Sequence, residues 1–83
     1  MFIPIGIDAF VAHHLEANPE TDAEATRKAV TEAVRAKKDG AKCWQCGEPI
    51  WAAGSAVAGH NGCFTCITGE EDSSGDFEIA DAL

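Results

Sequence analysis

Two pairs of cysteines dominate the second half of this 83-residue sequence. Cys43 and Cys46 form the first pair and Cys63 and Cys66 the second, with two residues inside each pair and sixteen between the pairs. This spacing lets both sulfurs of a pair reach one ion, and two such pairs complete a tetrahedron. Gly47 favours a tight turn after the first pair, because glycine adopts positive φ without steric strain. The sequence therefore predicts one four-cysteine site for Zn²⁺.

A zinc ion would compensate for the small hydrophobic core of so short a chain. A chain this short buries too little apolar surface to be more than marginally stable without help. Structural zinc contributes an apparent free energy of about 10–16 kcal/mol in small zinc domains. We therefore expect the ion to stabilise the fold rather than to take part in catalysis.

The N-terminal residues bear on location. The stretch 1–7 is apolar, but Pro4 and Gly6 interrupt it and no basic residue precedes it, so no export signal is predicted. No run approaches the roughly 20 apolar residues of a membrane span. We expect a cytoplasmic protein, and in that reducing compartment paired cysteines are more often metal ligands or catalytic thiols than disulfides.

The residues before the cysteines predict two helices. Asp8 is the expected N-cap of the first, whose apolar side groups Phe10, Val11, His14 and Leu15, and Asn18-Pro19 ends it. The second is predicted over 22–38, from the capping-box pattern of Thr21 and Glu24 to the stop at Gly40. Its apolar stripe is Ala23, Val30, Ala33 and Val34. The two helices are expected to pack as an antiparallel pair.

Short apolar segments surround and follow this pair. Residues 2–5 indicate a short strand or an apolar arm, with Pro4 arguing against a central strand. Between the cysteine pairs, 50–52 and 55–58 are expected to form a hairpin that turns at Ala53-Gly54. In the tail, Phe77, Ile79 and Leu83 form an alternating apolar face that could return to the core. The predicted fold class is α+β: a helical segment, 1–42, and a loop-rich zinc module with an acidic tail, 43–83, packed as one domain.

Part of this module resembles the first half of a LIM domain. The stretch from Cys43-Trp-Gln-Cys46 to Ile50, followed by His60-Asn-Gly-Cys63-Phe-Thr-Cys66, is similar to that family's opening knuckle and its His-x-x-Cys-Phe-x-Cys segment. The resemblance covers 43–66. It implies a zinc site of Cys43, Cys46, His60 and Cys63, a second site beginning at Cys66, and a role in protein interaction.

The sequence departs from that family in two respects. Thirteen residues separate Cys46 from His60, fewer than is usual, and Gly69 stands where the second site needs its next ligand. No later Cys or His exists, so a second zinc site cannot form and Cys66 is free to serve the first. A single treble-clef or zinc-ribbon-like module is then expected. The sequence leaves two candidates for the fourth ligand. Cys66 would give four thiolates, the commoner solution, and His60 would give three thiolates and an imidazole.

Charge restricts the partners. The chain has a net charge of −8, and residues 43–83 carry seven acids with no Lys or Arg. Affinity for nucleic-acid backbones comes mainly from Lys and Arg, so nucleic-acid binding is disfavoured. The expected partner is a protein with a basic surface. Nothing in the sequence decides between a monomer and a homodimer.

The remaining candidates are weaker. His13 and His14 are interpreted as a solvated residue and a partly buried packing residue, and Trp44 and Trp51 as core side chains covering the metal. No nucleophile has an evident base, so the chain is not expected to be an enzyme. The expected function is that of a zinc-stabilised interaction or regulatory adaptor. The alternative is a redox or electron-transfer protein that uses the same sulfurs, as a rubredoxin-like iron site or a reactive dithiol.

Overall fold

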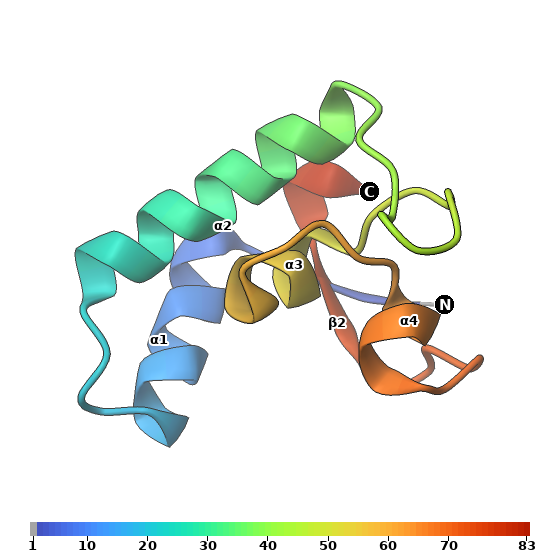
Figure 1. The fold of residues 1–83 in the computed structure, drawn as a ribbon. Helices are drawn as coiled ribbons and strands as arrows, with labels where there is room; N and C mark the ends of the chain where they lie inside the picture. Colours follow the sequence, from blue (N-terminus) through green and yellow to red (C-terminus); the bar gives the residue numbers. More distant parts are fainter. Residues whose placement is uncertain (1) are drawn as a thin grey trace.

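The computed structural model describes residues 2–83. It contains helices and a small sheet in the order β1 (Ile3–Ile5), α1 (Ile7–Ala17), α2 (Ala23–Lys38), α3 (Ala52–Ala58), α4 (Phe64–Thr68), β2 (Phe77–Ile79) and the 3₁₀ helix η1 (Ala80–Ala82) (Figure 1). The α+β class predicted from the sequence is confirmed.

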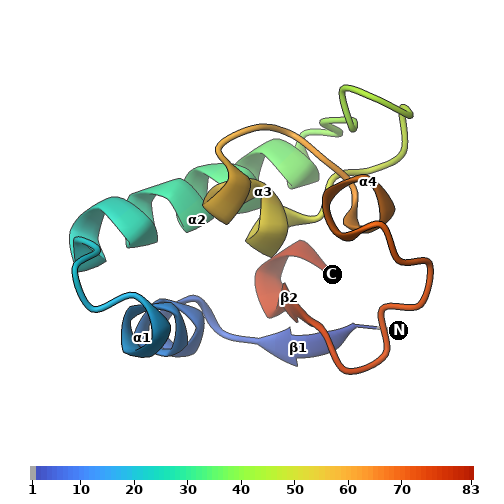
Figure 2. The ribbon, with the colours of Figure 1, turned by 60° about the horizontal axis from the view of Figure 1, so that its bottom comes forward.

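The sheet joins the first and last parts of the described chain. β1 and β2 pair in parallel, with Ile3 opposite Phe77 and Ile5 opposite Ile79 (Figure 2). Pro4 fits because a two-stranded sheet has only edge strands, whose outer N–H groups need no partner. Of the two forms open to residues 2–5, a strand and an apolar arm, the structure shows the strand over residues 3–5.

The helices α1 and α2 confirm the two predicted helices and their C-terminal ends at Asn18 and before Gly40, but not their N-caps. Gly6 is the N-cap of α1, which places Asp8 in the first turn, where it forms an ion pair with Arg27 of α2. Asp22 is the N-cap of α2, and its carboxylate accepts a hydrogen bond from the Glu24 backbone N–H at 3.1 Å. The capping box predicted at Thr21 is therefore wrong by one residue.

The arrangement of α1 and α2 also differs from the prediction. Figures 1 and 2 show their axes crossing at a wide angle rather than running antiparallel. The buried face of α2 packs chiefly against α3. In both figures α1 lies below α2 and crosses it. The core cluster accordingly draws on both halves of the chain: Val30, Ala33 and Val34 from α2, Ala52 and Ala53 from α3, and Ile79 from β2.

The hairpin predicted within 50–58 is wrong, because this stretch forms the helix α3. Four of its seven residues are alanine, the strongest helix former. A distant residue completes it: the Glu78 carboxylate accepts hydrogen bonds from the backbone N–H groups of Ala52 and Ala53, at 2.8 and 2.9 Å. Those N–H groups have no partner inside the helix, so Glu78 supplies the cap that the local sequence lacks.

Candidate metal centre

The first cysteine pair lies in a tight turn directly after α2. Lys42 and Pro49 form an antiparallel bridge at its base, and the Cys43 N–H donates to the Glu48 carbonyl at 2.7 Å. The chain reverses at Gly47, whose φ is +79° and whose N–H donates to the Cys43 carbonyl at 3.0 Å. The glycine predicted to permit this turn therefore does so.

The second pair lies at the start of α4. Cys63 is the N-cap of this helix, and its sulfur accepts a hydrogen bond from the Cys66 N–H at 3.4 Å. The residue before it is fixed from α3: the Ser55 hydroxyl donates to the Gly62 carbonyl at 3.0 Å and accepts from the Gly62 N–H at 3.1 Å. The short helix α3 thus sets the position of the second pair.

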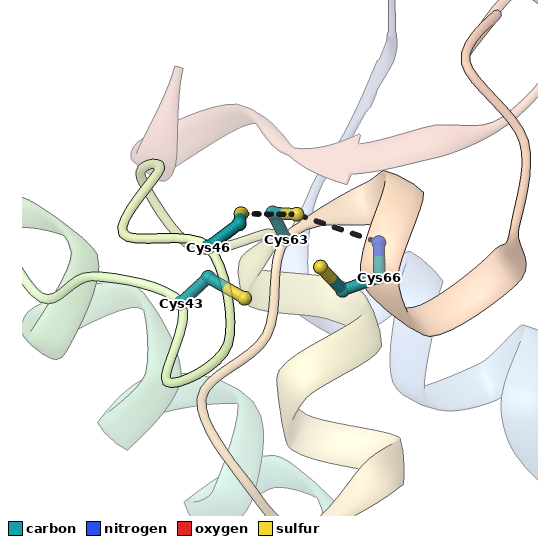
Figure 3. Close-up of side chains that lie close together, drawn as sticks. All are labelled: Cys43, Cys46, Cys63 and Cys66. Atoms are coloured by element: carbon teal, nitrogen blue, oxygen red, sulfur yellow. Dashed lines mark hydrogen bonds between the residues drawn. The ribbon is translucent and has the colours of Figure 1, made fainter.

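The fold brings the four sulfurs together. The Sγ atoms of Cys43, Cys46, Cys63 and Cys66 all lie within 4.8 Å of one another, and none is part of a disulfide. Figure 3 shows the four side chains turning toward a shared centre from the two segments. Cys43 and Cys63 are buried, Cys66 is half-buried and Cys46 is exposed. Four sulfurs so placed could hold one metal ion.

The thiols hold their protons unequally. Burial alone would raise the pKa of Cys43, but backbone hydrogen bonds from Cys46 and Cys63 lower that pKa to about 6. The pKa of Cys66 is raised to about 12, chiefly by side-chain hydrogen bonds with Cys63 and Cys43. A backbone hydrogen bond with Glu48 lowers the pKa of Cys46, but side-chain hydrogen bonds with Cys63 and Cys43, together with burial, outweigh it and raise that pKa. A cation binding here would displace protons, as thiolate coordination requires.

His60, the alternative fourth ligand, lies outside this sulfur cluster. Its side chain is exposed, and its ring meets that of Trp44 edge-on, with 6.2 Å between the ring centroids. Trp44 itself is 69% exposed, so its predicted place in the core is wrong. Trp44 lies between two cysteines whose sulfurs turn toward the shared centre, while its own ring faces solvent.

Trp51, by contrast, is partly buried as the sequence predicts. Its indole N–H donates to the Phe77 carbonyl at 2.8 Å, and its ring packs against those of Phe2 and Phe64, at centroid distances of 5.8 and 4.9 Å. Phe64 directly follows Cys63. The aromatic cluster therefore attaches the second cysteine pair to the sheet.

The histidines of α1 have the places predicted for them. His13 is exposed, and His14 is half-buried with its ring stacked on that of Phe10 at 6.3 Å. Two important residues were missed by sequence reasoning, Ser55 and Glu78, because each acts on a segment that only the fold brings near it. In the sequence, an acid between Phe77 and Ile79 has the alternation of a solvent-facing strand position, so no local signal indicated that Glu78 is buried.

The described part of the chain contains no helix that is both long and apolar enough to cross a bilayer.

No protein-family model, curated protein or solved structure matches this chain. The four converging cysteines are therefore the strongest indication of function that it offers.

Proposed function

We propose that this is a zinc-binding protein in which Cys43, Cys46, Cys63 and Cys66 hold one structural Zn²⁺ ion. The observation that carries the proposal is the convergence of four unpaired sulfurs within 4.8 Å of one another. Thiolate sulfur is the ligand that structural zinc sites use most, in tetrahedral sets of four. Four protein ligands leave no open position for a substrate, which supports a structural rather than a catalytic ion.

The same sulfur set would also suit iron, which is the alternative function as an electron-transfer protein. Neither cysteine pair has the Cys-Pro-x-Cys-Gly form of rubredoxins, and this favours zinc. Metal analysis of the purified protein separates the two. We expect one equivalent of zinc and a colourless solution, whereas red protein containing iron would contradict the zinc proposal.

The fourth ligand is tested by a pair of variants. We expect Cys66→Ser to lower zinc affinity by at least about tenfold, since it removes one of the four thiolates. His60→Ala is the matched control and should keep both stoichiometry and affinity, because the imidazole lies outside the sulfur cluster. Cadmium-113 NMR reads the donor set directly. A spectrum of three sulfurs and one nitrogen, lost in His60→Ala, would overturn the assignment of Cys66.

The role that best fits this site is that of a protein-interaction or regulatory adaptor. The resemblance of 43–66 to the LIM opening module supports such a role, because LIM domains serve in protein interaction. Seven acids and no Lys or Arg in residues 43–83 favour a partner with a basic surface and disfavour nucleic acid. Binding to a basic protein that weakens with added salt and is lost on zinc removal would support this role.

A further inference from the structure

An apolar groove lies between α1, α3 and α4, away from the sulfurs. It has a volume of about 290 Å³. The residues that line it are Phe10, Trp51, Ala53, Gly54, Val57, Ala58, Ile67 and Thr68. Seven of the eight are apolar and none is charged. Such a lining is suited to an apolar side chain, with few polar groups to satisfy.

The groove stays open because its floor is built from small residues. Ala53 and Gly54 lie beneath it, and Gly54 could not be larger: a Cβ there would lie 2.1 Å from the Trp51 ring. On its edge, Val57 is 57% exposed and is not one of the core residues. The inner wall of the groove is shared with the core, through Ala53, Phe10 and Trp51, whereas its edge at Val57 faces outward and is available to a partner.

The charge around the groove selects the kind of partner. None of the six Lys and Arg residues of the chain lines it. α3 and α4 both end there, at Ala58 and Thr68, and the carbonyls of these two residues accept no hydrogen bond from residues 2–83. The acidic run that begins at Glu70 follows directly, and the Glu70 N–H donates to the Thr68 hydroxyl at 3.1 Å. The groove thus has an apolar floor and a negative end.

We propose that this groove receives an apolar side chain from a basic segment of a partner protein. The proposal rests on the adaptor role and makes it specific: the apolar contact anchors the segment, while Lys or Arg beside it meet the free carbonyls and the acidic run. A second copy of this chain is a poor occupant, because two molecules with a net charge of −8 repel each other. An anionic membrane surface is disfavoured for the same reason.

The test begins with defined peptides added to zinc-loaded protein. The probe is a short amphipathic peptide of leucine and lysine, followed by amide chemical shifts. We expect shift changes centred on residues 51–58 and 67–70. The same peptide with glutamate in place of lysine, or serine in place of leucine, should bind at least about tenfold more weakly, since each removes one half of the complementarity. Changes spread over the acidic surface and equal for the serine peptide would overturn the proposal.

A pair of variants locates the contact. Val57→Lys places a cation on the edge of the groove and should weaken peptide binding by about tenfold. Leu83→Lys is the matched control: Leu83 is equally apolar and 63% exposed, but it does not line the groove, and its change should alter affinity by less than about twofold. Equal losses in both variants would show that general charge attraction, and not the groove, binds the peptide.

Two further measurements separate the possible failures. Zinc content is determined for every sample, so that full zinc loading without peptide binding contradicts the groove and leaves the metal proposal standing. Peptide binding to zinc-free protein would contradict the metal-dependent role instead. Sedimentation that shows self-association abolished by Val57→Lys, or binding to lipid vesicles that needs Val57, would assign the groove to a second copy or to a membrane and overturn the proposal.

Discussion

At the scale of single residues, Glu78 has the most unusual environment in the described chain. Its side chain is completely buried. One carboxylate oxygen accepts from the Lys37 ammonium and the Ala52 N–H, both at 2.8 Å, and the other from the N–H groups of Ala53 and Ile79, at 2.9 and 2.8 Å. A buried carboxylate is tolerated when its oxygens are paired in this way. One residue thus connects α2, α3 and β2.

We expect Glu78→Gln to destabilise the protein by about 3 kcal/mol. The amide turns an N–H₂ group toward backbone N–H donors, and it leaves the Lys37 ammonium without its counter-charge. Urea unfolding of the zinc-loaded protein measures the change. Glu71→Gln, on an exposed loop, is the control and should stay within about 0.5 kcal/mol of the unsubstituted protein. Equal stability of the two variants would mean that the carboxylate at Glu78 has no structural role.

At the scale of the secondary-structure elements, α3 is the centre of the molecule. Its N-terminus is capped by Glu78, its buried alanines pack on α2, and Ser55 holds the approach to Cys63. Trp51, the residue before it, lies against Gly54, one turn into the helix. The packing of this ring on α3 leaves no room for a Cβ.

We expect Gly54→Ala to destabilise the protein by about 1–3 kcal/mol, although alanine is the better helix former, because the Trp51 ring must move. Urea unfolding and the tryptophan fluorescence spectrum report the loss and the displaced ring. Gly6→Ala is the control: a Cβ at Gly6 has no atom within 4 Å, so only the smaller cost of alanine at the N-cap of α1 is expected. A Gly54→Ala variant as stable as the Gly6→Ala variant would contradict the close packing of Trp51.

The sequence predicted those elements that are set by local signals. Residues 22–38 carry their own caps and a helical apolar stripe, and the cysteine spacings predict the convergence of the sulfurs directly. α3 was mistaken for a hairpin because its cap, Glu78, lies more than twenty residues away in the chain. Trp44 was mistaken for a core residue because it lies between Cys43 and Cys46. The sulfurs of these cysteines turn toward the shared centre, whereas the Trp44 ring faces solvent. Contacts between distant segments decided both cases.

At the scale of the whole molecule, the same secondary-structure elements hold the candidate metal centre and form the core. The core cluster takes three residues from α2 and three from α3 and β2, on the two sides of the first cysteine pair. The second pair is attached to the same α3 through Ser55 and to the sheet through the aromatic cluster. If the cluster holds zinc as proposed, loss of the ion should therefore loosen residues 43–83 and expose one face of α2.

We expect a zinc chelator to abolish the near-ultraviolet circular dichroism of the aromatic side chains and to leave part of the far-ultraviolet helix signal, which α1 and α2 supply. Added zinc should restore both, since metal binding and folding are coupled in small zinc domains. Chelator saturated with zinc beforehand is the control and should have no effect. Dispersed amide resonances over 43–83 in fully metal-free protein would contradict a structural role for the ion.

The pairing of β1 with β2 has a consequence for the order in which the protein folds, because the two strands are far apart in the chain. Residues 3–5 are made before the helices α1 to α4, and their partner strand, 77–79, is made after them. All four cysteines emerge before Glu78, the residue that caps α3. If zinc binds at the four cysteines as proposed, it can do so while the first strand is still unpaired, and we expect the pairing of the two strands to be a late step of folding.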